Sequence, residues 1–467
     1  MITFLKTYGT LILGPIIALC ILFIPSELDY LQQRFLAIFS LTVFYWLFGN
    51  IPLFVTGFLG VSLSIIFGLD SASKILASFS NSIIFLFLGG FLLAKAFNNS
   101  GLDNRISLYL LTRKFIKGSI SKLILVLILL TAIFSMWISN TATVAMMLPL
   151  VIGALKSLKI TNKKTISLIL LSIAYSASIG GIGTPIGSTP NIIGIGMLSE
   201  LINIKLTFFD WIKIGMPLSF LFLFILFFII KFSIRNDQIY FDNSFLLKEY
   251  KKLPTLSSYE IQTFIVFIST VFFWLLPSIG QLLSFKIPIN LDPGVVVLFT
   301  SSILFILPFN SERKILLASD IKNIDWSSLL LFGAGIALGK LLFDLGLANM
   351  AGNYLITLVR EWNLFLLLLI LFGSIIFFTE FTSNTASANI IIPIIISLST
   401  KLNLDPILMT MGVSIACSLA FMLPIATPPN AIVYGTEMVS KDEMLKNGFF
   451  LNIIFSLLLT MIVYLIA

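Results

Sequence analysis

Short polar motifs interrupt the apolar sequence at four places and form two matched pairs. Ser139-Asn140-Thr141 is repeated as Ser383-Asn384-Thr385, and Gly187-Ser188-Thr189-Pro190-Asn191 resembles Ala426-Thr427-Pro428-Pro429-Asn430. Ser, Thr and Asn cap helices and offer neutral oxygen atoms that can ligate hard cations. Carbonyl groups at the end of a helix attract cations, and N–H groups at the start of the next helix attract anions. The motifs therefore predict a site where a cation and an anion are held together.

The residue types that are missing narrow this chemistry. The 467-residue chain contains no His, which excludes imidazole catalysis and His metal ligands, and its two Cys, Cys20 and Cys417, lie in apolar runs, where Cys packs as a small residue. No nucleophile–base pair or pair of acids lies near the motifs, so we do not expect an enzyme. No Lys or Arg lies near them either. A bound anion would therefore need hard cations beside it to balance its charge in a low-dielectric cavity.

The surrounding sequence predicts membrane helices. Hydrophobic types make up 58% of the chain and charged types 11%, compared with about 25% charged residues in an ordinary soluble domain. This composition excludes a soluble enzyme, a disordered protein and a nucleic-acid-binding domain. Because roughly 20 apolar residues span a bilayer, we expect eleven crossing segments, at 8–24, 35–50, 51–69, 81–97, 166–201, 209–232, 260–276, 293–308, 327–343, 405–438 and 447–467.

Two further apolar stretches, 123–155 and 363–399, each contain a Ser-Asn-Thr motif near the middle. Each could form two short crossings or a hairpin that enters and leaves on one side. The hairpin arrangement with a cytoplasmic N-terminus puts most of the 29 Lys and Arg on the inner side, as the positive-inside rule requires. The C-terminus would then lie outside. The net charge of +8 thus reflects topology, and the basic stretch 103–122 is expected to form a helix on the inner surface.

An internal repeat relates the two halves of the chain. Residues 86–102 resemble 331–347, with Lys95 over Lys340 and Gly101 over Gly346, and the polar motifs match in the same order at nearly the same offset. The first of these segments is the fourth crossing and its counterpart is the ninth, so the repeats have inverted topology. Inverted repeats with broken helices that meet at the bilayer midplane are typical of secondary transporters.

With these motifs, nearly the whole chain resembles the divalent anion:sodium symporter (DASS) family of sodium-dicarboxylate and citrate transporters. The resemblance implies an all-α membrane protein with eleven helices and two re-entrant hairpins, assembled as a homodimer. It also implies an elevator movement of a transport domain against a scaffold. The scaffold would comprise 1–118 and 236–360, and the transport domain 119–235 and 361–467.

The resemblance also assigns residues. It implies a first sodium site at Ser135, Ser139, Asn140 and Gly187, and a second at Thr379, Thr382, Asn384 and Ala426, where the ligand at Thr382 is a backbone carbonyl. It places the substrate at Ser139, Asn140, Thr141, Ser188, Thr189, Ser383, Asn384, Thr385, Thr427 and Pro428. Two or more Na+ ions would be co-transported.

The expected function is sodium-coupled import of C4-dicarboxylates such as succinate, fumarate and malate across a bacterial plasma membrane. Alternatives are a sodium-independent dicarboxylate exchanger, a sodium symporter for citrate or sulfate, and an anion channel. In the family's exchanger branch a basic residue tends to follow the Ser-Asn-Thr motif. Ala142-Thr143 and Ala386-Ser387 stand there in this chain, which favours the symporter.

One acid lies inside a predicted hairpin. Glu380 precedes the second Ser-Asn-Thr motif by three residues, and an intramembrane acid often has a function. Its counterpart in the first half is Met136, so proton coupling and a structural hydrogen-bonding role both remain open.

Overall fold

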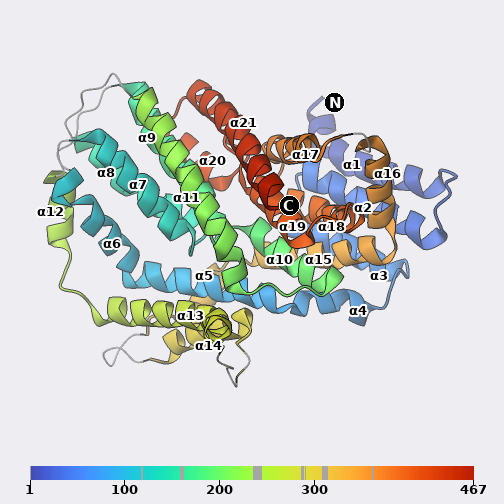
Figure 1. The fold of residues 1–467 in the computed structure, drawn as a ribbon, viewed down its shortest axis with the longest axis horizontal. Coiled ribbons are helices and arrows are strands. Elements are labelled where there is room, and N and C mark those ends of the chain that lie inside the picture. The colour runs from blue at the N-terminus through green and yellow to red at the C-terminus, as the bar shows by residue number, and fades with distance from the viewer. Residues whose placement is uncertain are drawn as a thin grey trace.

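The structure is a computed structural model that describes residues 2–116, 119–157, 162–234, 244–284, 289, 291–307, 314–359 and 362–467, with the side chains of 2–8, 156 and 157 left aside. Within these residues the chain forms 21 α-helices and no strand (Figure 1), which confirms the all-α prediction. Three short 3-10 helices, at Ser78–Ser80, Lys114–Ile116 and Ala318–Asn323, join some of them.

The helices of the first half are α1 (Ile2–Phe23), α2 (Tyr30–Phe48), α3 (Leu53–Ile66), α4 (Ala72–Ala77), α5 (Ser82–Ser100), α6 (Leu102–Leu111), α7 (Ile120–Ser135), α8 (Asn140–Ser157), α9 (Lys163–Gly181), α10 (Thr189–Ile202) and α11 (Phe208–Ser233). Those of the second half are α12 (Ser244–Lys252), α13 (Ser258–Leu282), α14 (Pro293–Ile306), α15 (Trp326–Asp344), α16 (Leu347–Val359), α17 (Leu364–Thr379), α18 (Asn384–Lys401), α19 (Pro406–Ser418), α20 (Pro428–Tyr434) and α21 (Lys441–Ile466).

Each of the eleven expected crossing segments contains at least one helix. Seven of the described helical segments are long and apolar enough to cross a bilayer by themselves: Tyr30–Phe48, Ala72–Ser100, Lys163–Gly181, Phe208–Ser233, Ser258–Leu282, Trp326–Asp344 and Lys441–Ile466. Many outward-facing apolar side chains are exposed, such as Phe264, Ile268 and Phe272 on α13, as expected of a surface that lies in lipid.

Two of the predicted long segments are interrupted, as their Gly and Pro residues indicated. The segment 166–201 divides into α9 and α10, and 405–438 divides into α19 and α20. The second helix of each pair starts at a Pro-containing motif, with Pro190 and Pro428 in the first turn, where Pro loses no helical hydrogen bond. The loops 182–188 and 419–427 between the half-helices are therefore ordered breaks within the packed interior.

The two Ser-Asn-Thr stretches fold as helical hairpins. A turn of four residues joins α7 to α8, and another joins α17 to α18. In each case the second helix begins at the Asn of the motif, at Asn140 and at Asn384. The motifs thus stand at the tips of the hairpins, as predicted.

The internal repeat is visible in local structure. Gly101 lies between α5 and α6 with φ of 76°, and Gly346 lies between α15 and α16 with φ of 74°. This left-handed conformation strains residues with a Cβ atom, which explains the matched glycines. The matched glycines also show that α16 is the counterpart of α6. This helix was not among the expected segments.

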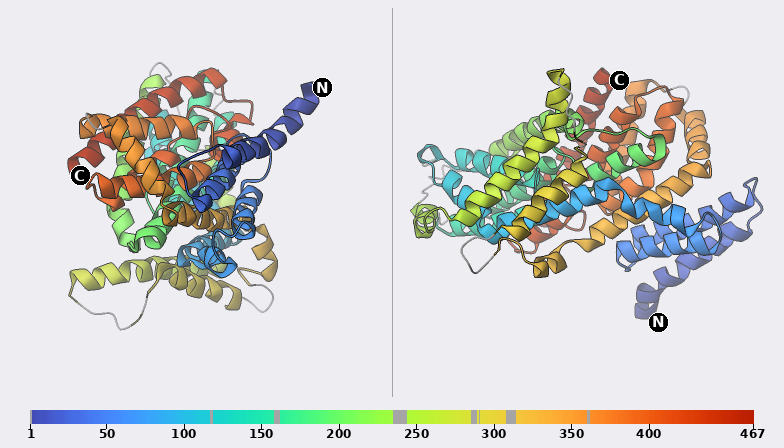
Figure 2. Two further views of the ribbon diagram at one scale, coloured as in Figure 1. Left: turned by 90° about the vertical axis from the view of Figure 1, so that its right-hand side faces the viewer. Right: turned by 90° about the horizontal axis from the view of Figure 1, so that it is seen from below.

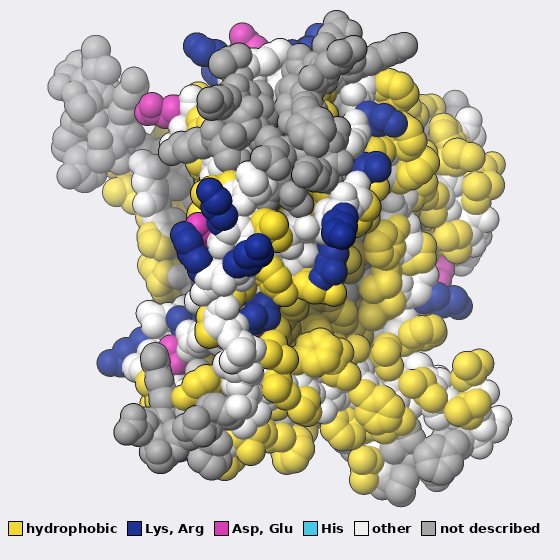
Figure 3. Space-filling model, turned by 90° about the vertical axis from the view of Figure 1, so that its left-hand side faces the viewer, with side chains coloured by type: hydrophobic (Ala, Val, Ile, Leu, Met, Phe, Trp, Pro, Cys, Tyr) yellow, Lys and Arg dark blue, Asp and Glu magenta, His cyan; other side chains and the backbone are white. Residues whose placement is uncertain are grey.

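The surface helix expected over 103–122 differs from the prediction. Helix α6 ends at Leu111, a 3-10 turn follows at Lys114–Ile116, and α7 begins at Ile120 behind the capping side chain of Ser119, with 117 and 118 outside the described residues. The cap starts a new helix, so the amphipathic stretch is split. The basic helix α12 packs near α6, and Figure 3 shows Lys and Arg side chains gathered on this end of the molecule.

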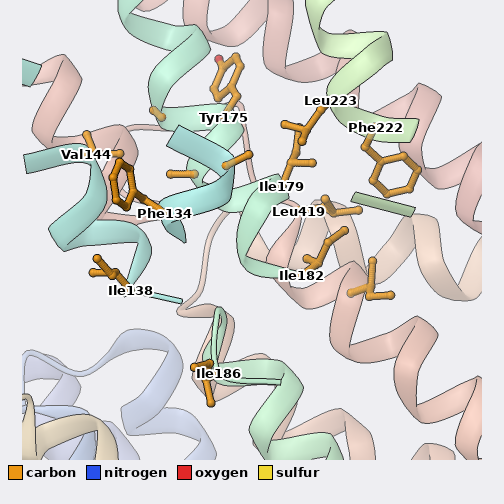
Figure 4. Packing of buried hydrophobic residues seen from close by; sticks show 14 of the residues in the cluster. Phe134, Ile138, Val144, Tyr175, Ile179, Ile182, Ile186, Phe222, Leu223 and Leu419 are labelled. Carbon is orange, nitrogen blue, oxygen red and sulfur yellow. The ribbon is translucent and has the colours of Figure 1, made fainter. Parts of the chain in front are cut away.

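Dense apolar packing surrounds α9 and its break. The interrupted helix is buried over almost its whole length, and Ile179, Ile182, Phe222 and Leu419 converge beside its break (Figure 4). Helices α13 and α14 lie together at one side, with α5 between them and the rest (Figure 2). The breaks are therefore held by a dense apolar core, which keeps their polar groups in fixed positions.

Candidate substrate and ion site

The four polar motifs meet in one cavity of about 900 Å3. One wall is formed by the two hairpin tips and the two helix breaks, and the opposite wall by parts of α2, α3, α5 and α15. The structure places all ten predicted substrate residues on the cavity surface: Ser139, Asn140, Thr141, Ser188, Thr189, Ser383, Asn384, Thr385, Thr427 and Pro428. The fold thus brings together residues that are up to 289 positions apart in the sequence. Their role as ligands stays a prediction.

The cavity surface carries almost no charge. Among its described lining residues there is no Lys or Arg, as the sequence indicated, and Asp325 is the one charged side chain. Asp325 caps α15 and accepts hydrogen bonds from the backbone N–H and the hydroxyl of Ser328. Helices α8, α10 and α18 begin at this cavity, so their N-terminal partial positive charges supply its fixed attraction for an anion.

The first predicted sodium site is a group of converging oxygen atoms. The side-chain oxygen position of Asn140 lies 2.5 Å from Ser135 Oγ, 3.0 Å from the Ala177 carbonyl oxygen and 3.1 Å from the Gly187 carbonyl oxygen. When the Asn140 amide nitrogen turns inward, all three atoms lie within hydrogen-bonding distance of its two N–H donors. When the amide oxygen turns inward it faces acceptor oxygens only, and a hard cation is the kind of ligand that could bridge such oxygens. The structure thus brings the predicted ligands Ser135, Asn140 and Gly187 together, while their binding of sodium stays a prediction.

The position of Gly187 in this group depends on its lack of a side chain. A Cβ atom there would lie 2.5 Å from the Gly181 carbonyl oxygen and 2.8 Å from the Ser135 carbonyl oxygen. The break of the helix therefore presses directly against the end of α7. Only Gly permits this approach without a shift of the backbone.

The second predicted sodium site repeats this pattern. Thr379 Oγ1 lies 2.8 Å from Asn384 Oδ1 and 3.0 Å from the Cys417 carbonyl oxygen. A hydroxyl has one hydrogen to donate, so three oxygens here share a single proton. Thr379 is completely buried, as is Ser135 in the first group, and neither lines the cavity.

Two other residues predicted for the second site make hydrogen bonds outside this oxygen group. Thr382 Oγ1 turns back into its own hairpin, where it contacts Ser387 Oγ at 2.6 Å and the Phe378 carbonyl at 3.3 Å. This leaves its side chain outside the oxygen group. Ala426 is buried at the end of the helix break and lines the cavity, and its N–H donates to the Leu423 carbonyl.

Hydrogen bonds between the two halves close the site. Thr189 Oγ1 lies 2.9 Å from Thr385 Oγ1, and Ser188 Oγ lies 2.8 Å from Ser418 Oγ. The break of the first half is thus joined to the hairpin tip and to the interrupted helix of the second. Ser418 and Asp325 were not identified from the sequence, because neither belongs to a duplicated motif.

The final Asn of each break motif supports the loop rather than the cavity. Asn191 Nδ2 donates to the carbonyls of Gly181 and Thr184, at 2.9 and 2.8 Å. Asn430 Nδ2 donates to the carbonyls of Ala420 and Leu423, at 3.2 and 3.1 Å. The identical spacing in both halves marked these two Asn residues in the sequence. It did not indicate that they support the loop.

Comparison with known proteins identifies the family. The model of the sodium:sulfate symporter transmembrane region matches residues 5–466. The chain belongs to this family, the DASS family. It is accordingly a membrane transporter and not an enzyme.

Individual relatives agree with this assignment. The DASS chain is 31% identical to the sodium-dependent dicarboxylate transporter SdcS of Staphylococcus saprophyticus, over 97% of this chain and 90% of the relative. It is 35% identical to an uncharacterized transporter of Haemophilus influenzae, over 90% and 88% of the two chains. The crystal structure of the Alcanivorax borkumensis YdaH transporter matches with a TM-score of 0.54 at 12% identity, covering 83% of this chain and 87% of that chain, and shows likeness of fold alone.

Proposed function

We propose that this protein imports C4-dicarboxylates such as succinate, fumarate and malate, driven by two or more co-transported sodium ions. The observation that carries the proposal is the pair of oxygen groups around Asn140 and Asn384, which flank a cavity lined by no basic side chain among its described residues. The dicarboxylate specificity of the SdcS relatives supports the choice of substrate.

The electrostatics of the cavity support obligatory coupling. A dianion in a low-dielectric site is strongly unfavourable without compensating positive charge. Helix N-termini supply only partial positive charges, and the Asp325 carboxylate adds a negative charge. Two sodium ions, one in each oxygen group, would neutralise a dicarboxylate. Binding of substrate without sodium would therefore be weak, and substrate would not cross the membrane uncoupled.

Contacts that differ between the two halves support alternating access. Helix α15 packs against α18, and a Cβ atom on Gly335 would overlap the side chain of Asn389. The equivalent positions in the first half are Gly90 on α5 and Ala145 on α8. There Ala145 faces the cavity, and the contacts nearest to a Cβ at Gly90 are with Ile186, starting at 3.8 Å.

Inverted repeats can exchange such arrangements. In the opposite state, Gly90 would pack on Ala145, and Gly335 would separate from Asn389. Both amide atoms of the buried Asn389 lack a hydrogen-bond partner here, a cost that separation from α15 would relieve. We infer an elevator movement of residues 119–235 and 361–467 against residues 1–118 and 236–360, in a homodimer whose subunits contact through the latter.

The proposed topology also assigns a direction to this state. With the N-terminus in the cytoplasm of a bacterial cell and the C-terminus outside, Pro52 and Asp325 would lie toward the cytoplasm. Both line the cavity. The structure would then be inward-facing.

Uptake of labelled succinate into proteoliposomes tests the proposal, with sodium, potassium or proton gradients imposed in turn. We expect uptake only with an inward sodium gradient, and competition by fumarate and malate. Uptake that ignores sodium but requires internal dicarboxylate would identify an exchanger instead. Stronger competition by citrate or sulfate would change the substrate, and a flux that never accumulates succinate above equilibrium would indicate a channel.

A further inference from the structure

The carboxylate of Glu380 is completely buried and points into the second helix break. Oε1 accepts hydrogen bonds from the N–H groups of Phe421 and Met422, at 2.6 and 2.8 Å, and Oε2 accepts one from the N–H of Leu423, at 3.1 Å. Asn452 Nδ2 on α21 donates to Oε1 at 2.8 Å. One side chain thus binds three successive backbone donors of the loop that follows α19.

These donors need a partner at this point. The loop lies inside the protein, where an unpaired N–H group is costly, and the helical hydrogen bonds of α19 have ended. The carbonyl groups of the same loop are held by Asn430, at Ala420 and Leu423. Leu423 in turn accepts the N–H of Ala426. Glu380 and Asn430 together therefore fix the course of the loop from α19 to Ala426.

The first half also links its hairpin turn to its helix break, but without a charged side chain. At the equivalent position, the backbone carbonyl of Met136 accepts a hydrogen bond from the Thr184 hydroxyl in the first break. The position is thus the link between hairpin turn and helix break in both halves. Only the second half has a carboxyl side chain at this position. The two oxygen groups therefore have different electrostatic surroundings.

A role in carrying protons does not suit these contacts. The four described partners of Glu380 are all donors, and a protonated carboxyl group would need an acceptor for its own hydrogen. These contacts suit a side chain that holds the loop in place.

We propose that Glu380 is a positioning residue for the second sodium site. Its side chain clamps the loop Phe421–Leu423 and so places Ala426 for the oxygen group of Thr379 and Asn384. This inference rests on the proposed sodium coupling, and it predicts that the second site depends on the Glu380 clamp, whereas the first site has no carboxyl group at the equivalent position.

The test compares Glu380→Gln with Met136→Leu, the matched change at the equivalent position of the first half. Backbone hydrogen exchange of residues 419–427 in purified protein reports on the clamp without reference to transport. We expect faster exchange in Glu380→Gln and unchanged exchange in Met136→Leu. Unchanged exchange in Glu380→Gln would overturn the clamp even if the protein proves not to use sodium.

The second measurement is the sodium concentration that gives half-maximal succinate uptake. We expect a rise of about tenfold in Glu380→Gln, typical of coupling between sites, with the KM for succinate at saturating sodium changed much less. A lower maximal rate with an unshifted sodium curve would indicate a merely structural role and overturn the proposal.

A milder variant covers the case in which Glu380→Gln does not fold. Asn452→Ala removes one donor and leaves the carboxylate with its three backbone partners. We expect a shift of the sodium curve in the same direction, by about threefold. No shift in this variant would contradict the proposal. If wild-type uptake ignores sodium, the proposed function fails, while the exchange measurement still decides whether the clamp exists.

Discussion

The hydroxyl oxygens of Thr189 and Thr385 lie 2.9 Å apart, although 196 residues separate them in the chain. Thr189 opens α10 after the first helix break, and Thr385 lies at the tip of the second hairpin. Both line the cavity. This hydrogen bond joins the two repeats at the place where a substrate carboxylate is expected, so it couples the geometry of one half to that of the other.

Replacing each of these hydroxyls by a methyl group should reveal the coupling. In Thr189→Val and Thr385→Val we expect a severalfold higher KM for succinate, since each change leaves the other hydroxyl without its partner. The loss of binding free energy in the double variant should be about 1 kcal/mol smaller than the sum of the two single losses. The reason is that the shared hydrogen bond is lost only once. Strictly additive losses would show that the two hydroxyls act separately.

Removal of either central Asn should abolish sodium-dependent uptake. Asn140→Ala and Asn384→Ala each delete one oxygen from an oxygen group, and a hard cation that loses a ligand binds much more weakly. The measurement is succinate uptake in a sodium gradient, with size-exclusion chromatography to verify a folded protein. Asn104→Ala on α6, outside the cavity, serves as the control and should transport normally. Normal uptake in both site variants would exclude these residues as ligands.

Much of this site could be predicted because its signals are local and duplicated. Hydropathy marked the spans, since lipid requires apolar helices. Ser-Asn-Thr in the middle of an apolar stretch predicted the hairpin tips, and Gly and Pro predicted the breaks. The match of Gly101 with Gly346 also indicated a helix after Gly346, which is α16. Periodicity alone did not reveal this helix, because it is short and lies between longer spans.

Other features could not be read from the sequence because they depend on contacts between distant segments. The role of Glu380 is defined by N–H groups about 40 residues away, and backbone donors carry no residue-specific signal. In the sequence, Asp325 could not be distinguished from other helix-capping residues. Its place on the cavity surface depends on how the fold packs α15.

The close approach at Gly187 gives a steric prediction. Gly187→Ala should reduce uptake strongly, because its Cβ would lie 2.5 Å from a backbone oxygen that cannot move aside cheaply. Gly373→Ala on α17 is the matched control. There a Cβ would meet Ser456 at an ordinary distance of 3.9 Å, so uptake should persist. Equal activity of the two variants would show that the break can shift away from α7 without loss of the ion site.

Cysteine pairs can detect both proposed states of the elevator. After replacement of Cys20 and Cys417, a pair at positions 335 and 389 should cross-link in the state described here, where Gly335 and Asn389 are in contact. The equivalent pair at 90 and 145 should cross-link only in the opposite state, where Gly90 would pack on Ala145. Conditions that favour one cross-link should therefore reduce the other, because the two contacts exclude each other.

Transport decides whether these contacts belong to the working cycle. Either cross-link should stop succinate uptake, and reduction should restore it, because each one holds the transport domain in a single position. Single-cysteine variants at the same four positions provide the controls and should be insensitive to oxidant. If both pairs cross-link fully in one population, or if cross-linked protein continues to transport, the helices α5 and α15 do not exchange roles and the elevator movement proposed from the repeats is wrong.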